Sequence, residues 1–225
     1  MAAPGAARRE TGPVERPAGG TARDTVRAGY DRAAASYTDS RARQPGEDLV
    51  LLDALLAGLQ AGRRVLDAGC GAGIPVAERI VAAGHAVTGL DLSFGQLALA
   101  RDHVPACPTV QGDLATLPFP RATFDVVVSF YAIIHVPREE HAEVFAELRR
   151  VLRPGGTALL CLGWVEKAAD HDPDSWLGVP MYWSHFAADT NLALLAGAGM
   201  RVESSREVTD PMGHASHQFV VATAP

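Results

Sequence analysis

The sequence lacks the features that mark membrane-spanning, disulfide-rich and metal-binding proteins. Among its 225 residues, no apolar run approaches the roughly 18 residues that a membrane-spanning helix needs. Its three cysteines, Cys70, Cys107 and Cys161, form no C-x-x-C pair. Neither a disulfide framework nor a metal site is therefore predicted, and a reducing cytoplasm is the expected setting. The net charge of −6 lacks the basic excess of a nucleic-acid-binding surface.

Residues 1–21 contain almost no large apolar side chains. They are rich in Ala, Gly, Pro, Arg and Thr, a composition that cannot bury enough surface to offset the entropy lost on ordering. Glu10, Glu15 and the missing serines argue against a transit peptide, and an apolar signal core is absent. We expect a disordered tail over residues 1–21 and one domain over residues 22–225, a length that suits a single α/β core.

The sequence does contain a glycine-rich turn after a short apolar strand, Val65-Leu66-Asp67-Ala68-Gly69-Cys70-Gly71-Ala72-Gly73. Glycines permit backbone conformations closed to other residues and let a ligand approach the main chain. The helix that follows offers free N–H groups, so the first hypothesis is a nucleotide-like ligand. The third glycine comes one position early for the dinucleotide fingerprint, and no Walker lysine follows. On this motif alone, a turn that only connects a strand to a helix remains the alternative.

Short apolar strands and helices alternate after this turn. The predicted strands cover residues 63–67, 86–90, 108–111, 124–129 and 157–162, and the predicted helices cover residues 74–83, 93–102 and 138–151. This alternation predicts a parallel, doubly wound sheet that binds ligands at the carboxyl ends of its strands. Asp67, Asp91 and Asp113 fall at or just after three such ends. Asp91 lies 24 residues after Asp67, near the spacing of about 20 at which an acid reaches a ribose.

Two flanking regions allow two interpretations each. Tyr30, Ala34 and Tyr37 share one face of a predicted helix, which either packs on the core or forms a lid with its rings toward a cationic ligand. Residues 164–186 hold all three tryptophans, so this connection is either a hydrophobic cluster over the sheet edge or a substrate-binding cap. Helices over residues 47–59 and 187–197 and strands near residues 200–208 and 216–223 complete the expected fold.

Five motifs occur in a fixed order between residues 65 and 156: VLDAGCGAG, GLDLS, QGDLATLPFP, FDVVVSF and LRPGG. Together they resemble the class I S-adenosylmethionine-dependent methyltransferases of the small-molecule type. The resemblance implies a Rossmann-like, doubly wound seven-stranded α/β sheet, mostly parallel, with an antiparallel C-terminal hairpin and N-terminal lid helices. It implies S-adenosyl-L-methionine as cofactor and S-adenosyl-L-homocysteine as product. The expected activity is methyl transfer to a small metabolite, and the aromatic residues of 164–186 favour one with an apolar or aromatic body.

The resemblance also implies particular cofactor contacts. Asp67 would support the cofactor's amino group, Asp91 would accept the ribose hydroxyls, and Asp113 would accept the adenine amino group. The whole expected cofactor-binding set is Tyr30, Tyr37, Asp67, Gly69, Cys70, Gly71, Asp91, Leu92, Gln96, Gly112, Asp113, Leu114, Ser129, Phe130 and His135.

Methyl transfer is an in-line displacement with a neutral leaving thioether, so the enzyme mainly holds the nucleophile close to the methyl carbon. A base is needed only if the nucleophile must lose a proton. His135, six residues after the fourth strand, is the first candidate, and His185 in the cap is the second, although each is equally well explained as a packed histidine. Tyr30 is a third candidate catalytic residue. The residues expected to hold the acceptor are Trp176, Tyr182 and Trp183.

Two other functions remain open at this stage. One is an S-adenosylmethionine-binding enzyme that uses the sulfonium for cyclisation or lyase chemistry, which needs no second substrate. The other is a non-catalytic cofactor-binding module, against which the intact acids Asp67, Asp91 and Asp113 argue mildly. We expect a small-molecule acceptor as the partner and neither a nucleic acid nor a membrane. The sequence specifies neither the methylated atom nor the oligomeric state.

Overall fold

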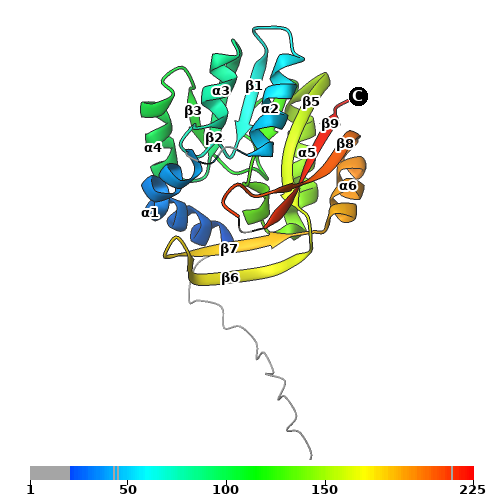
Figure 1. The fold of residues 1–225 in the computed structure, drawn as a ribbon. Coiled ribbons are helices and arrows are strands. Elements are labelled where there is room, and N and C mark those ends of the chain that lie inside the picture. The colour runs from blue at the N-terminus through cyan, green and yellow to red at the C-terminus, as the bar shows by residue number, and fades with distance from the viewer. Residues whose placement is uncertain (1–20, 43, 45, 214) are drawn as a thin grey trace, which may run out of the picture.

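The computed structural model describes residues 21–42, 44, 46–213 and 215–225, so the expected disordered tail lies, except for Thr21, outside the described residues. A seven-stranded sheet forms its centre (Figure 1). The strands are β1 (Arg64–Ala68), β2 (Ala86–Asp91), β3 (Thr109–Gln111), β4 (Phe124–Ser129), β5 (Leu152–Gly163), β8 (Arg201–Thr209) and β9 (Ser216–Thr223). Their spatial order is β3-β2-β1-β4-β5-β9-β8, with β9 antiparallel to both neighbours. The expected Rossmann-like α/β sheet is confirmed.

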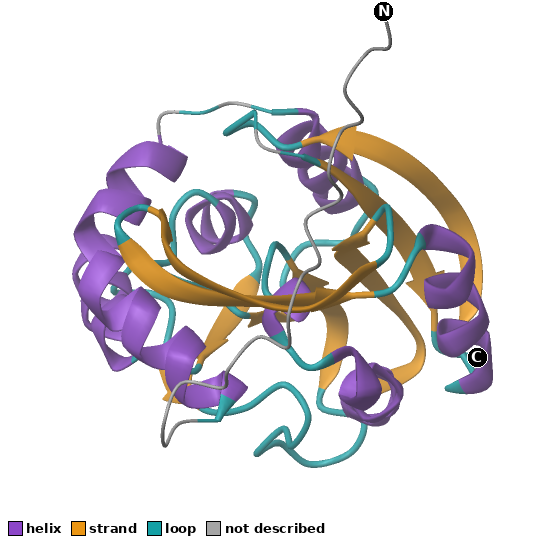
Figure 2. Ribbon diagram, turned by 90° about the horizontal axis from the view of Figure 1, so that it is seen from below, coloured by secondary structure: helices purple, strands orange, loops and turns teal. Residues whose placement is uncertain are grey.

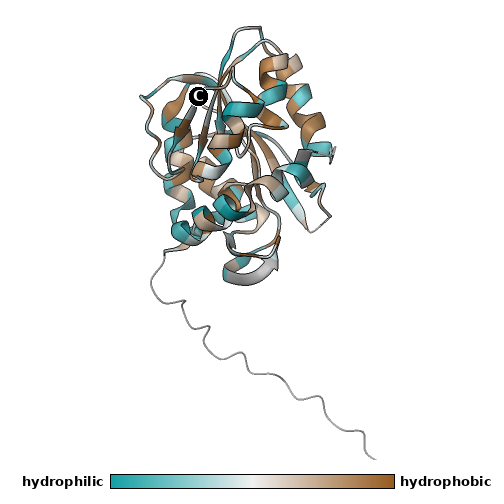
Figure 3. Cartoon of the chain, turned by 90° about the vertical axis from the view of Figure 1, so that its left-hand side faces the viewer, coloured by the Kyte–Doolittle hydropathy of each residue, from teal (hydrophilic) through white to brown (hydrophobic). Residues whose placement is uncertain are grey.

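Helices cover both faces of this sheet. They are α2 (Glu47–Ala57), α3 (Val76–Ala82), α4 (Phe94–His103), α5 (His141–Val151) and α6 (Ala188–Gly197). α3 and α4 connect strands in one direction along the sheet and α5 connects them in the other, so right-handed crossovers place them on opposite faces. Figure 3 shows the result, with apolar strands between helices whose outer sides are polar.

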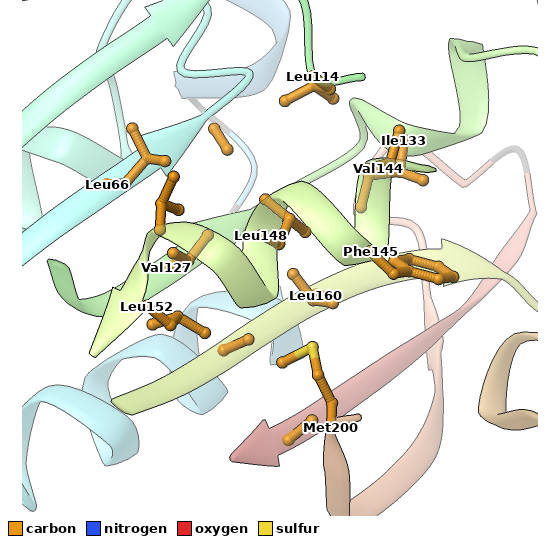
Figure 4. Packing of buried hydrophobic residues seen from close by; sticks show 14 of the residues in the cluster. Leu66, Leu114, Val127, Ile133, Val144, Phe145, Leu148, Leu152, Leu160 and Met200 are labelled. Atoms are coloured by element: carbon orange, nitrogen blue, oxygen red, sulfur yellow. The ribbon is translucent and has the colours of Figure 1, made fainter. Parts of the chain in front are cut away.

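The central strands are apolar along their whole length because helices bury both of their faces. Successive side chains of a strand point to opposite faces, so Val65 joins the core under α2 and α3 and Leu66 joins the core under α5. Figure 4 shows this second core, where Leu66 and Val127 lie near Leu148 of α5. Because both of its faces pack against filled cores, the sheet is rigid, and the carboxyl ends of its strands have fixed positions.

Three element boundaries differ from the sequence prediction by more than two residues. The strand predicted over 157–162 begins at Leu152, because the N–H of Gly155 and the carbonyl of Gly156 both pair with Ala224 near the C-terminus. The helix predicted over 138–151 begins as a 3-10 turn, η2 (Arg138–Glu140), before α5. The first helix, α1 (Ala22–Ala42), runs five residues past Tyr37. Local sequence patterns carry no signal for a partner that is distant in the chain.

The segment 164–186 forms a second, two-stranded sheet of β6 (Lys167–Trp176) and β7 (Val179–His185). This hairpin lies beside α1, and Figure 2, seen from that end, shows it crossing in front of the main sheet. The contact between the two is close: a Cβ atom on Gly29 of α1 would lie 2.6 Å from the carbonyl oxygen of Pro180. The hairpin and α1 therefore form one roof over this end of the sheet.

Candidate active site

A pocket lies between α1 and the carboxyl ends of β1 to β4. Most residues that the sequence assigned to a cofactor line it: Tyr30, Tyr37, Asp67, Gly69, Cys70, Gly71, Asp91, Leu92, Gly112, Asp113, Leu114, Phe130 and His135. Gln96 and Ser129 are buried outside this lining, and the Ser129 hydroxyl donates to the carbonyl of Ala68 at 2.7 Å. The fold thus brings segments from four strand ends and one helix to a single site.

The glycine-rich turn after β1 requires glycine at its first position. Gly69 has φ = 88°, and a Cβ atom there would lie 2.2 Å from the Cβ atom of Ala132. The N–H groups of Gly69 and Cys70 donate to the carbonyl of Leu90 at 2.7 and 2.9 Å. These bonds tie the turn to β2 and hold its main chain against the pocket.

Asp67 at the end of β1 is a buried carboxyl group without a hydrogen-bond partner on Oδ2 among the described residues. Its side chain is 1% exposed. Burial, followed by the charge of Asp91, raises its pKa to about 8. A buried oxygen in this state favours a ligand that donates a hydrogen bond or carries positive charge.

The other two acids have partners. Asp91 accepts N–H bonds from Gly71 at 2.8 Å and Ser93 at 2.9 Å, and burial still raises its pKa. Asp113 accepts the N–H of Ala115 at 2.9 Å and forms an ion pair with Arg23. A carboxylate accepts about four hydrogen bonds, so both side chains retain capacity for a ligand.

Helix α1 is fastened over the pocket at several points. Arg23 near its start pairs with Asp113 and with Glu140 of η2. Midway, Asp31 accepts hydrogen bonds from the Ser93 hydroxyl at 2.6 Å and the Gly95 N–H at 2.8 Å. Ser93 also accepts the Gln96 N–H at 3.1 Å and so forms the N-cap of α4. The lid interpretation of this helix is the one that the geometry supports.

The far end of α1 carries a buried polar network that the sequence did not reveal. Arg41, 5% exposed, pairs with Asp48 of α2 and lies 5.5 Å from the ring centre of Tyr131. The Tyr131 hydroxyl donates to the same Asp48 carboxylate at 3.1 Å. Eighteen residues of helix separate Arg23 from Arg41, about 27 Å, so the two arginines mark opposite ends of the pocket that both line.

His135, in the 3-10 turn η1 (Ile133–His135) after β4, is engaged at both ring nitrogens. Nδ1 lies 2.8 Å from the carbonyl oxygen of Tyr182, which only accepts, so Nδ1 carries the proton. Nε2 then accepts the Tyr30 hydroxyl at 2.9 Å. Burial lowers the pKa of His135 to about 4, so the ring is neutral at pH 7.

The hairpin's aromatic residues, predicted to hold the acceptor, do not line this pocket, and their role in acceptor binding stays a prediction. Trp176 packs on Tyr30 and Tyr37 with ring centres 5.0 and 5.4 Å apart. Trp183 packs on His135 at 4.3 Å. The Tyr182 side chain is buried with α1 residue Val26. The reason is the position of α1, whose tyrosines stand between the hairpin and the pocket.

His185, the second predicted base, also lies outside the pocket lining. Its Nδ1 lies 2.8 Å from the carbonyl oxygen of Val165, and its ring packs against Gly163, where a Cβ atom would lie 2.0 Å from Nδ1. Burial lowers its pKa to about 4. The ring thus joins the hairpin to β5, and its role as a base stays a prediction.

Comparisons with known proteins agree with this geometry. A family described as a methyltransferase domain matches residues 65–156. A sterol 24-C-methyltransferase of Gibberella zeae is 39% identical over 105 residues, 44% of this chain and 27% of the relative. A malonyl-[acyl-carrier protein] O-methyltransferase of Enterobacter lignolyticus is 38% identical over 154 residues, 68% of this chain and 57% of the relative. The chain spans about a quarter to just over half of the length of these relatives.

A solved structure shares the fold over nearly the whole chain. The 1,6-didemethyltoxoflavin-N1-methyltransferase of Burkholderia thailandensis, with bound 1,6-didemethyltoxoflavin and S-adenosylhomocysteine, has a TM-score of 0.71 and 20% identity. The match covers 94% of this chain and 93% of that chain. Residues 65–156 thus match a methyltransferase domain, and the motif order, the strand order and these relatives together support a class I S-adenosylmethionine-dependent methyltransferase.

Proposed function

We propose that this protein transfers the methyl group of S-adenosyl-L-methionine to a small metabolite with an apolar or aromatic body. The observation that carries the proposal is the unpaired Oδ2 atom of Asp67, buried beside the glycine turn in the pocket. An ammonium group is the ligand part that best satisfies such an atom. When bound, S-adenosyl-L-methionine supplies an electrophilic methyl group on a sulfonium.

The residues present fit this cofactor along the sheet. Asp113 after β3 would hold the adenine amino group, Asp91 at the end of β2 the ribose hydroxyls, and Asp67 at the end of β1 the amino group. Because β4 follows β1 in the sheet, the acceptor would lie over β4. The apolar side chains that line the pocket just after β4 are Phe130, Ala132 and Val136.

The chain's own contribution to catalysis is position and exclusion of water. Helix α1 covers the pocket, and its Tyr30 and Tyr37 line it. On the side away from the pocket, Trp176 of the hairpin packs against these rings, and Trp183 packs against His135. In this proposal Trp176, Tyr182 and Trp183 shape acceptor binding indirectly, and His135 and Tyr30 form the polar pair nearest the reaction.

We also propose a cytoplasmic setting with no nucleic-acid or membrane partner. All three cysteines are free and buried, as a reducing compartment allows. No helix in the described part of the chain has both the length and the apolar character that a bilayer requires. Over the same part, no three His, Cys, Asp or Glu side chains gather as a metal site.

Two measurements test the cofactor. The protein should bind S-adenosylhomocysteine in calorimetry and ignore NAD. Asp91→Ala should weaken that binding at least tenfold, because it removes a charge-assisted contact worth roughly 1.5–3 kcal/mol per bond and frees the Gly71 N–H. Unchanged affinity in Asp91→Ala, or tight binding of NAD, would contradict the placement.

The transfer itself is tested with methyl-labelled S-adenosylmethionine and fractionated metabolite extracts, followed by mass spectrometry of whatever gains the label. A parallel reaction without extract identifies cyclisation or lyase chemistry, because those reactions consume the cofactor without an acceptor. Labelled product only in the presence of extract supports methyl transfer.

A further inference from the structure

We propose that the acceptor enters this site as a nucleophile with no proton to lose: a carboxylate, an already ionised phenol or enol, or an uncharged ring nitrogen. In this arrangement His135 is a positioning residue for Tyr30 and takes no proton from the acceptor. The inference deepens the proposed methyl transfer and rests on it. It specifies which acceptors the pocket selects.

The first argument is the hydrogen bonding of His135. A general base needs a free nitrogen within reach of the proton that it removes. Both nitrogens of His135 are occupied, Nδ1 by the Tyr182 carbonyl and Nε2 by the Tyr30 hydroxyl. Tyr30 donates its only proton to His135, so its oxygen offers the pocket lone pairs and no hydrogen. The Tyr30 oxygen is therefore held in one orientation by His135 and can only accept hydrogen bonds from a ligand in the pocket.

The second argument concerns a proton relay through Tyr30, which would leave His135 as an imidazolium. No carboxylate among the described residues pairs with His135. The rings packed on it are Tyr30 from α1 and Trp183 from β7, and neither carries a negative charge that would stabilise an imidazolium. With a pKa of about 4, only about one molecule in a thousand would hold that proton at pH 7. The surroundings of His135 therefore disfavour the imidazolium that a proton relay through Tyr30 would create.

The third argument concerns the other groups at the acceptor end. Once Asp67, Asp91 and Asp113 face the cofactor, the polar side chains left in the lining there are Tyr37, Thr38, Arg41 and Tyr131. Burial raises the pKa of Tyr37 to about 12 and raises that of Tyr131 further above its ordinary value. Arg41 is a cation, and its partner Asp48 already accepts from Arg41, Tyr131 and Leu49. None of these groups accepts a proton at pH 7.

The resulting step needs no proton acceptor. A lone pair on the acceptor forms the bond to the methyl carbon while the bond between that carbon and sulfur breaks. The bonding electrons stay on sulfur, which leaves as a neutral thioether. A carboxylate becomes a neutral ester and a ring nitrogen becomes an N-methyl cation, so atoms and charge balance without a base.

The first test follows the protonation of His135 by ¹⁵N NMR in the complex with S-adenosylhomocysteine, with His135→Asn used for assignment. We expect Nδ1–H and an unprotonated Nε2 from pH 8 down to about pH 5. Tyr30→Phe should shift the Nε2 resonance, whereas Tyr37→Phe, from the same helix, should not. A His135 that titrates near its ordinary value of about 6.5 would overturn the inference. Failure to bind S-adenosylhomocysteine would instead contradict the proposed function.

The second test uses the product found with labelled extracts. We expect a methyl ester, an aryl or enol methyl ether, or an N-methylated ring. With that acceptor, His135→Asn should lower kcat less than tenfold, whereas loss of a general base costs about 10²–10⁴. Its pH–rate profile should follow the acceptor's own ionisation and keep the same acidic limb in the variant. An alkyl ether, a methylated primary amine, or a loss above 10² with a lost acidic limb would overturn the inference.

Discussion

At the scale of single residues, Asp67 has a consequence for pH. Its pKa rises from 3.8 unfolded to about 8 folded, so the ligand-free fold favours the protonated form. Stability from this group is complete below the unfolded pKa and is lost as pH rises towards 8. An ammonium ligand beside Asp67 favours the ionised form. Cofactor binding should therefore release a proton below pH 8.

We predict that the affinity for S-adenosylhomocysteine rises with pH, by up to about tenfold per unit between pH 5.5 and 7.5. Calorimetry in buffers of different ionisation enthalpy measures both the affinity and the released proton. Asp67→Asn is the matched variant, with the same shape and no titration, and its affinity should vary much less over this range. A flat profile in the unmodified protein would show that the cofactor's amino group lies elsewhere.

The sequence identified residues whose role depends on local spacing. Asp67, Asp91 and Asp113 follow apolar strands, and parallel strands bring such positions to one edge, so their shared pocket was predictable. The sequence also located His135 at this edge. It gave no sign that both ring nitrogens would be occupied, because the Tyr182 carbonyl and the Tyr30 hydroxyl come from segments 47 and 105 residues away.

At the scale of elements, α1 is a lid that is fastened at several points by polar groups. The Arg23 pairs with Asp113 and Glu140 connect its first turns to the β3 end of the pocket. These side chains are about one-third exposed, at 36%, 27% and 34%, so each pair contributes at most about 1 kcal/mol. Because these ion pairs are weak, α1 should lower the rate of ligand release only modestly.

We predict that Arg23→Gln raises the Kd for S-adenosylhomocysteine about three- to tenfold, mainly through faster release. Stopped-flow displacement measures the release rate. Arg32→Gln is the control, because Arg32 is exposed on the same helix. Equal effects of the two substitutions would mean that net charge, and not the contact with Asp113 and Glu140, accounts for the change.

The hairpin shows what element prediction leaves open. The aromatic residues of 164–186 allowed either a hydrophobic cluster over the sheet edge or a substrate-binding cap. In the structure, Trp176 packs on Tyr30 and Trp183 packs on His135, and a direct role of these residues in acceptor binding stays a prediction. Which layer an aromatic ring occupies depends on how closely α1 approaches β7 at Gly29, a tertiary contact without a local pattern.

At the scale of the whole molecule, the sheet is far more predictable than its roof. Strand order follows from alternating βα units and right-handed crossovers, which depend on nearby residues. The roof depends on contacts between α1, α2, the hairpin and the loop after β4. One of these, the network of Arg41, Asp48 and Tyr131, is buried and joins the lid to the body.

This network allows a stability test of how the roof is attached. Asp48→Leu should destabilise the fold by about 3–5 kcal/mol, because it leaves the Arg41 charge buried without its partner. Replacing all three polar groups, as Arg41→Met, Asp48→Leu and Tyr131→Phe, should restore stability to within about 2 kcal/mol, since well-packed apolar residues often replace a buried ion pair at little cost. Urea unfolding followed by circular dichroism measures both values.

If the triple variant is as unstable as the single one, the loss comes from packing at position 48 and not from an unpaired charge. If Asp48→Leu alone costs less than about 1 kcal/mol, α1 reorganises freely, and the closed roof is only one of several positions of this helix.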